Sequence, residues 1–373
     1  MDQGRDVVDL TTDQRRRGLE ALIARAEGNA PAMAALSRLL RTDGWKEAAV
    51  ALAARALALA PDHAEVRTIA RGILSADVPS WHFAIIRDEP RNRAYEDALN
   101  RAVTPGSRVL EIGTGTGLLA MLAARAGAAH VFTCEMEPAV ALAARDVIAR
   151  NGLADRITVL SKCSTDVALA EIGGPVDLLV SETVSNDMLA EDPLPAIEDA
   201  IARLVKPGGV VIPARGRVRV ALAYEARMEA RKISTISGFD LSPFNRLASP
   251  FYQVNAVSPH LEIRSEAGDL FDFDFQSAGP WPDERGTVEV VAHGGPVNGI
   301  VQWIALDMDE AGCYENRPGG AASSWSPLFH PFPAAIESRP GQPYAIDGRH
   351  DSTALRLWWD SGRRNRASAE RSA

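Results

Sequence analysis

The chain has 373 residues, of which 46% are hydrophobic and 24% charged, close to the average for globular proteins. This length suggests two or three domains, and the composition excludes a mostly disordered, collagen-like or coiled-coil chain. The 49 acidic residues outnumber the 40 Lys and Arg by nine, which argues against nucleic acid as a partner. Three cysteines without a CxxC spacing indicate neither a disulfide framework nor a zinc site and predict a cytoplasmic protein. Neither a signal peptide nor a membrane span is recognised in the sequence.

Residues 1–78 are rich in Ala, Leu and Arg, and apolar positions recur three and four residues apart from about residue 14. This periodicity predicts consecutive amphipathic helices. The stretch 31–64 resembles a tetratricopeptide unit in its length and its ALALAPDHA ending. We consider a helical cap on the next domain and a peptide-binding repeat equally compatible with the pattern, because one unit provides little concave surface.

Strand-like and helical runs alternate over residues 79–215, as they do in βαβ units. After a helix over 88–102, strands are predicted at 108–113, 129–135, 156–162, 176–182 and 208–213. Helices are predicted between them, at 118–126, 138–151 and 195–205. We therefore expect a Rossmann-like parallel sheet that binds a ligand at the carboxyl ends of its strands.

Residues 216–360 contain short alternating strands, which predict a β-barrel or a β-sandwich. The polar insertion at about 227–252 is too long for a hairpin, and we expect it to be helical. Residues 361–373 are predicted to be a disordered tail.

A glycine-rich loop follows the first predicted strand, with Gly113, Gly115 and Gly117 at alternate positions. Glycine allows the backbone to turn tightly and to approach a ligand without a Cβ in the way. In the dinucleotide fingerprint the third glycine falls three residues after the second, but here that position is Leu118. The pattern GxGxG favours S-adenosylmethionine over NAD.

Two acidic residues end the first two predicted strands. Glu111 is expected to meet the amino-acid portion of the cofactor, and Glu135 is expected to bind both ribose hydroxyls. The neighbouring Glu137 is expected to be solvated.

Two further acidic residues, Glu182 and Glu191, lie in the SETVSNDMLAEDPLP loop after the fourth strand. The Asn/Asp-Pro-Pro-aromatic signature of many amino-group and amide methyltransferases is absent at this point. Two converging carboxylates match a guanidinium, which is planar and offers a fork of donors. They would orient one nitrogen toward the methyl donor and localise positive charge away from it. Acids in a loop can equally be solvated.

The Glu-x8-Glu spacing resembles the double-glutamate loop of the protein arginine methyltransferases. The segments WHFAIIRDEPRNRAYEDAL (81–99), NGLADRITVLSKCSTDV (151–167) and VNGIVQWIALDMDEAG (297–312) are also similar to segments of that family. The N-terminal helices and the phrase SGFDLSPFN (237–245) are most similar to the ninth and seventh human types. The resemblance covers the chain from about residue 79 to 359.

The resemblance implies that Arg91 contacts the carboxylate of the cofactor and that Asp88 supports the active site. It implies that Ser164 and Thr165 border the adenine and that Trp325 lines the arginine channel. An arm at about 227–252 implies a homodimer that acts on arginine in a protein or peptide.

The sequence departs from the family pattern at two points, which predicts a less supported site. No tyrosine lies near residues 72–76, and Ser324 stands where the family has the histidine of its Thr-His-Trp loop. Two alternatives therefore stay open. One is a methyltransferase for a small guanidino or amine acceptor, and the other is an inactive scaffold whose N-terminal helices recruit a protein partner.

Overall fold

The computed structural model describes residues 12–277 and 279–359. The predicted tail at 361–373 lies outside these residues. Within the described part of the chain, no helix is both long and apolar enough to cross a bilayer.

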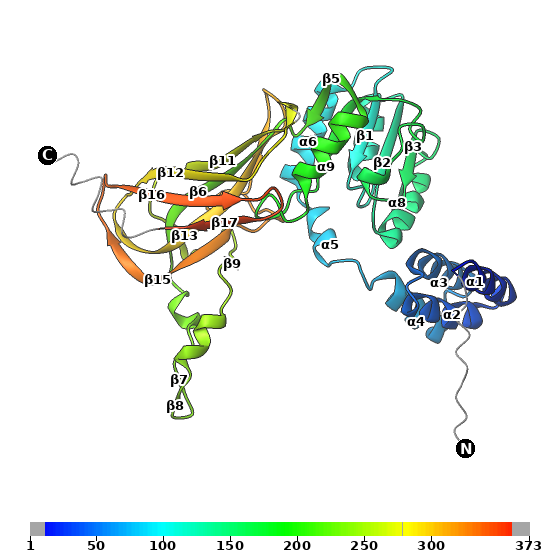
Figure 1. Cartoon of the computed structure of the whole chain (residues 1–373), viewed down its shortest axis with the longest axis horizontal. Helices are drawn as coiled ribbons and strands as arrows, with labels where there is room; N and C mark the ends of the chain where they lie inside the picture. Colours follow the sequence, from blue (N-terminus) through cyan, green and yellow to red (C-terminus); the bar gives the residue numbers. More distant parts are fainter. Residues whose placement is uncertain (1–11, 278, 360–373) are drawn as a thin grey trace.

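The N-terminal helices form a small unit of their own, here called the helical unit (residues 12–74, Figure 1). It comprises α1 (Thr12–Ala26), α2 (Ala30–Thr42), α3 (Lys46–Leu59) and α4 (Ala64–Leu74). Asn29 caps α2 by accepting a hydrogen bond from the backbone of Ala32. Apolar side chains at helical spacing, including Met33, Leu40 and Val66, bury against one another. The predicted helical character is confirmed.

A five-stranded parallel sheet with the order β3-β2-β1-β4-β5 follows. Its strands are β1 (Arg108–Ile112), β2 (His130–Cys134), β3 (Ile157–Leu160), β4 (Val176–Ser181) and β5 (Val205–Ile212). Its helices are α5 (Trp81–Ile85), α6 (Glu89–Ala102), α7 (Leu118–Ala126), α8 (Pro138–Arg150) and α9 (Pro193–Arg203). The predicted Rossmann-like sheet is confirmed, and the strand order reverses between β1 and β4, where such sheets bind their ligands.

The strands after residue 214 all pair antiparallel and form what is here called the β domain (residues 215–359). One sheet has the order β10-β6-β13-β15-β9, with β11 beside β6 and β14 beside β13, and a second has the order β12-β16-β17. The strands are β6 (Arg215–Glu225), β9 (Tyr252–Gln253), β10 (Leu261–Ile263), β11 (Gly268–Asp274), β12 (Glu284–Val291), β13 (Gly295–Asp307), β14 (Cys313–Glu315), β15 (Leu328–Ser338), β16 (Pro343–His350) and β17 (Leu355–Trp358). Buried apolar residues form one cluster from β4 to β13, so the parallel sheet and the β domain share a core.

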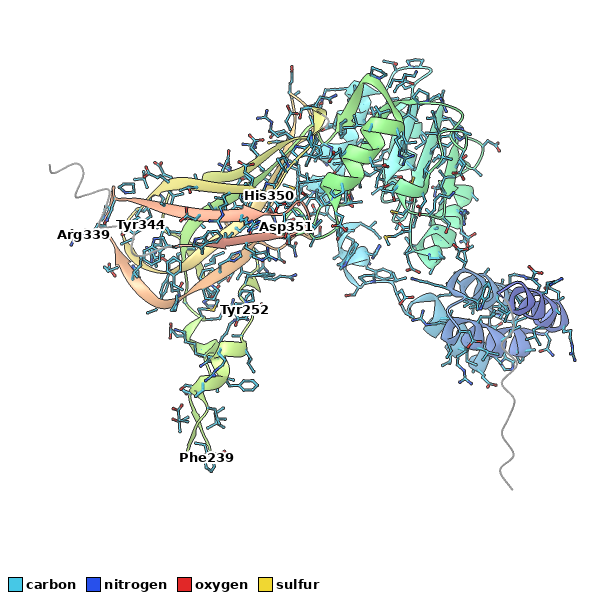
Figure 2. All side chains as sticks on the ribbon, viewed as in Figure 1. Phe239, Tyr252, Arg339, Tyr344, His350 and Asp351 are labelled. Carbon is cyan, nitrogen blue, oxygen red and sulfur yellow. The ribbon has the colours of Figure 1, made fainter. Side chains whose placement is uncertain are left out.

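The segment 227–252, here called the arm, projects away from the β domain and ends in a hairpin with Phe239 at its tip (Figures 1 and 2). It contains β7 (Thr235–Ile236), β8 (Phe239–Asp240) and the short 3₁₀ helices η2 (Glu229–Arg231) and η3 (Ser242–Leu247). The expectation of a helical insertion is therefore wrong beyond these two short turns. Gly238 has φ +86° at the hairpin turn. The Asn245 side chain accepts a hydrogen bond from the backbone N–H of Ile233 and donates one to its C=O, each at 2.8 Å. These contacts favour a looped backbone over an α-helix.

Candidate active site

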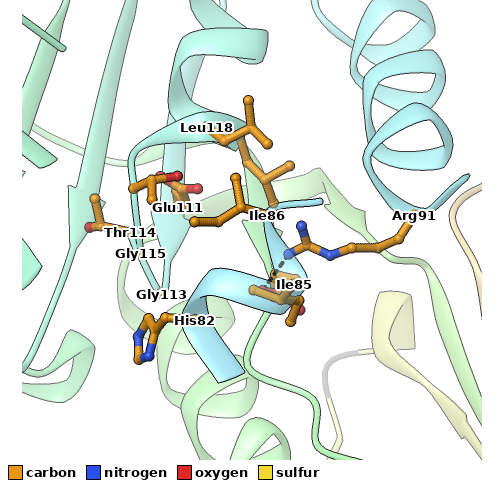
Figure 3. A pocket seen from close by; sticks show the side chains of 12 residues that line it. His82, Ile85, Ile86, Arg91, Glu111, Gly113, Thr114, Gly115 and Leu118 are labelled. Carbon is orange, nitrogen blue, oxygen red and sulfur yellow. Dashed lines mark ion pairs between the residues drawn. The ribbon is translucent and has the colours of Figure 1, made fainter. Parts of the chain in front are cut away.

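A cavity of about 40 Å³ lies at the carboxyl ends of β1 and β4. Figure 3 shows the side chain of Arg91 reaching toward it from α6, with His82 and Ile85 contributed by α5. Five residues that the sequence analysis predicted for the site line this cavity: Arg91, Glu111, Gly113, Gly115 and Glu182. The other lining residues are His82, Ile85, Ile86, Thr114, Thr116, Leu118 and Leu119. The loop glycines and two predicted acids are thus brought to one place.

Three glycines shape the loop between β1 and α7. Gly113 has φ +87°, and a Cβ there would lie 2.9 Å from Thr183 Cγ2. Gly117 has φ +80°, and its Cβ would lie 3.0 Å from Ile148 Cδ1. Gly115 has φ +51° but open space within 4 Å, so its backbone faces the cavity. The loop is therefore held by packing at its ends and left free for a ligand at its centre.

Glu111 is buried at the end of β1, with an exposed fraction of 1%. Its Oε2 accepts a hydrogen bond from Thr133 Oγ1 at 2.5 Å, whereas Oε1 has no partner. Desolvation, with the negative charges of Glu135 and Glu182, raises the pKa of Glu111 to about 8. A buried carboxylate oxygen without a donor marks a place for a ligand that brings one.

Glu135 connects the end of β2 to the glycine loop. Its Oε2 accepts from the backbone N–H of Gly115 at 3.0 Å, and its Oε1 accepts from that of Glu137 at 2.9 Å. Desolvation raises the pKa of Glu135 above its ordinary value. The expectation that Glu137 is solvated is wrong, because its carboxylate receives Lys46 Nζ at 2.5 Å.

Arg91 and Glu182 form a buried ion pair, with 2.5 Å between Nη2 and Oε2 and side-chain exposures of 5% and 11%. Arg91 Nε and Glu182 Oε1 have no hydrogen-bond partner. Desolvation raises the pKa of Glu182 to about 7 against the opposing effect of the Arg91 charge. Arg91, which is predicted to contact the cofactor, is therefore paired with Glu182, which is predicted to bind the acceptor guanidinium.

Glu191 does not line the cavity, and its side chain is exposed. Partial desolvation, followed by the charges of Glu182 and Asp187, raises its pKa to about 7, an effect that its exposure to solvent screens. Asp187 shapes the loop by accepting from the backbone N–H groups of Leu189 at 3.2 Å and Ala190 at 3.0 Å. Glu191 is therefore near enough to Glu182 for their charges to interact, but the two carboxylates do not line the same cavity.

Asp88 joins α6 to the β domain. Its Oδ1 caps α6 by accepting from the backbone N–H of Arg91 at 3.1 Å. Its Oδ2 accepts from Tyr314 Oη at 2.7 Å, Ser323 Oγ at 3.2 Å and Ser324, through N–H at 2.8 Å and Oγ at 3.0 Å. Desolvation opposes ionisation, but these donors outweigh it and lower the pKa of Asp88. Ser324, which stands in the place of the family's histidine, thus itself supports Asp88 with two hydrogen bonds. The predicted effect of the missing tyrosines stays a prediction.

Trp325 is buried and packs over the ion pair instead of lining the cavity. Its ring lies 5.9 Å from the Arg91 guanidinium and meets Tyr314 edge-on at 5.5 Å. Tyr95 lies 5.5 Å from the same guanidinium. Arg91 is therefore held between aromatic rings in addition to its ion pair.

Ser164 and Thr165 lie in the short helix η1 (Ser164–Asp166) after β3 and do not line the cavity. Arg203 Nη2 donates to their backbone carbonyls at 3.4 and 3.1 Å. The contribution of α5 to the cavity was not among the predicted site residues. His82 stacks on Trp81, with 4.0 Å between ring centroids, and also lines the cavity.

The site fits a cofactor that carries both an ammonium and a carboxylate group. Glu111 Oε1 and Arg91 Nε are buried polar atoms without a hydrogen-bond partner, although each side chain has a partner at another atom. Together with a GxGxG loop after β1 and an acid after β2, they define a Rossmann-like methyltransferase of the class that uses S-adenosylmethionine.

Comparisons with known proteins agree with this class. The family model for ribosomal protein L11 methyltransferase (PrmA) matches residues 96–215. An arginine N(omega)-methyltransferase from Streptomyces achromogenes subsp. streptozoticus is 37% identical over 291 residues, 77% of this chain and 78% of the relative. Human protein arginine N-methyltransferase 9 is 26% identical over 77% of this chain but only 38% of its own length. The Trypanosoma brucei PRMT1 enzyme-prozyme heterotetrameric complex with AdoHcy shares the fold, with a TM-score of 0.68 at 21% identity over 77% of this chain and 95% of that one.

The chain therefore belongs to the arginine N-methyltransferase family. S-Adenosylmethionine is its methyl donor, and its reaction is the methylation of an arginine guanidino nitrogen.

Proposed function

We propose that this protein methylates arginine in protein or peptide substrates and that Glu182 binds the acceptor guanidinium. One observation carries the assignment. The Arg91 guanidinium lies 2.5 Å from Glu182 Oε2, and this pairing of the carboxylate with one guanidinium supports the proposal that it binds another.

The proposed roles of the other residues combine their positions with the resemblance to the family, which alone assigns Ser164 and Thr165. S-Adenosylmethionine supplies an electrophilic methyl group when bound. Glu111, Glu135, Arg91 and the loop Gly113, Gly115 and Gly117 hold it, with Ser164 and Thr165 at its adenine edge. Glu182 Oε1 orients the acceptor nitrogen, and Glu191 contributes the second carboxylate. A buried carboxylate with a pKa near 7, as at Glu182, is matched to accept the proton released on methylation at neutral pH. Asp88 and Trp325 position Arg91.

The shape of the surface beside the site supports a polypeptide acceptor. A wide groove of about 440 Å³ is lined by residues of the α5–α6 turn and of the 322–324 loop, including Arg87, Glu89 and Ser323, and Asp88 also lines it. The groove is open to solvent, which leaves room for the chain on either side of an acceptor arginine. A second candidate is a small guanidino acceptor, favoured by the Streptomyces relative, whose name specifies arginine without specifying a protein.

The test compares acceptors and variants. The purified protein is incubated with labelled S-adenosylmethionine and either arginine-rich proteins or free L-arginine, followed by acid hydrolysis and amino-acid analysis. We expect label in methylarginine from protein, reduced at least about 100-fold by Glu182→Gln and also lost with Glu191→Gln. Glu96→Gln, an exposed acid paired with Arg125, serves as the control and retains activity.

Each outcome selects one function. Label in free arginine alone would replace the protein acceptor by the small-molecule acceptor. Cofactor binding without transfer to any acceptor would favour the inactive scaffold, in which the N-terminal helices recruit a protein partner.

We also propose that the β domain closes as a barrel and that the arm joins two copies into a homodimer. Large apolar side chains exposed on the arm support this proposal, among them Phe239, Phe244 and Leu247. A cytoplasmic location is supported by the free thiols of Cys134, Cys163 and Cys313.

A further inference from the structure

The helical unit contacts the methyltransferase domain beside the cofactor-binding acids. Its helix α3 lies against α8, and α8 begins directly after the acidic segment at the end of β2. Lys46, the first residue of α3, reaches across this contact. A cation at a helix N-terminus opposes the helix dipole, so its position is explained by partners outside α3.

Lys46 has two acidic partners. Its Nζ lies 2.5 Å from Glu137 Oε2 and 3.2 Å from Asp77 Oδ2. Asp77 is held in turn by Arg41, at 2.8 Å from Nη1 and 3.3 Å from Nη2. The side-chain exposures are 42% for Lys46, 36% for Asp77 and 14% for Glu137, so this is a partly buried network at a domain contact.

Two hydrogen bonds connect Glu137 to the glycine loop of the cofactor site. Glu137 is the N-cap of α8, and its backbone N–H donates to Glu135 Oε1 at 2.9 Å. Glu135 Oε2 accepts from the Gly115 backbone at 3.0 Å. Fixing Glu137 therefore fixes one of the two hydrogen bonds that hold the Glu135 carboxylate.

Asp77 connects Lys46 to a second element beside the cavity, helix α5. Asp77 lies in the connection between α4 and α5, and α5 contributes His82 and Ile85 to the cavity. Lys46 thus connects the segment before α5, through Asp77, to the acidic segment after β2, through Glu137.

We propose that Lys46 is a positioning residue for cofactor binding, through which the helical unit holds Glu135 and α5 at their spacing. This inference rests on the proposed role of Glu135 as a cofactor ligand. Lys46 touches neither cofactor nor acceptor, and its removal acts on cofactor affinity through the residues that it holds.

The test measures binding of S-adenosylhomocysteine to the full chain by isothermal titration calorimetry. Lys46→Met is expected to raise the Kd about three- to fivefold, the range of a partly exposed ion pair. Lys46→Arg keeps the cation and is expected to stay within about twofold of the parent. Arg55→Met removes an ion pair to Glu27 that lies wholly within the helical unit and is expected to leave the Kd unchanged.

A second readout uses the reciprocity of coupled equilibria. Addition of S-adenosylhomocysteine is expected to slow amide hydrogen exchange at the start of α3 and in residues 75–80, and Lys46→Met is expected to remove this protection. An unchanged Kd for Lys46→Met, or an equal rise for Arg55→Met, would overturn the proposal. Failure of arginine methylation with these binding changes intact would instead count against the proposed function alone.

Discussion

At the scale of single residues, the site depends on pairings between distant parts of the chain. The sequence pointed to Asp88, Arg91 and Glu182 individually, through motifs that resemble a known family. It did not predict that Arg91 pairs with Glu182 or that Tyr314 donates to Asp88. The first contact joins α6 to the loop after β4, and the second arises only when the β domain packs against the start of α6. No local pattern in the sequence signals either contact.

The buried Glu111 carboxyl makes stability depend on pH. Its pKa of about 8 in the fold lies above the ordinary value of 4.5, so folding favours the protonated form. The stability that this group contributes is present below about pH 4.5 and is lost as the pH rises through 8.

We therefore expect Glu111→Gln to reduce the loss of stability that the parent protein shows as the pH rises. In thermal unfolding of the ligand-free protein, the Tm of the variant should rise relative to the parent as the pH goes from 5 to 8, while affinity for S-adenosylhomocysteine falls. Parallel Tm curves across this range would show that Glu111 is not the titrating group.

At the scale of elements, alternating periodicity gave the parallel strands and their helices close to their observed bounds, because each βαβ unit is encoded locally. The arm was assigned wrongly for the same reason. Its looped backbone depends on the hydrogen bonds between the Asn245 side chain and the backbone of Ile233. The pattern of polar and apolar residues does not predict these bonds.

The glycine loop allows a matched comparison at this scale. Gly113 and Gly106 both have positive φ, +87° and +97°, but an added Cβ would meet a neighbour within 4 Å only at Gly113. Gly106→Ala is expected to cost about 1 kcal/mol from backbone strain alone. Gly113→Ala should cost more and weaken cofactor binding, as measured by denaturant unfolding and calorimetry. Equal losses in the two variants would refute a packing role for Gly113.

At the scale of the whole molecule, the arm carries exposed apolar side chains far from the core. Phe239 is 71% exposed, Phe244 61% and Leu247 69%. Such a surface is costly in water unless a partner covers it, and a second copy of the chain would bury it symmetrically.

We expect the protein to elute as a dimer and the double variant Phe244→Ser, Leu247→Ser to elute as a monomer in light scattering. Leu59→Ser, an exposed apolar residue of the helical unit, is the control and should remain dimeric. A parent protein of monomer mass at all concentrations would remove the proposed dimer.

The Arg91–Glu182 ion pair has a consequence for selectivity. Under the proposed role of Glu182, an incoming guanidinium exchanges with the Arg91 guanidinium that is already in place. Contacts made through the guanidinium alone would then yield little net affinity. In that case Arg91 competes with the guanidinium of the substrate, and the affinity for a substrate would come from contacts beyond that group. Methylguanidine should therefore inhibit far more weakly than an arginine peptide of several residues, and comparable inhibition constants would show that Arg91 leaves Glu182 before the acceptor arrives.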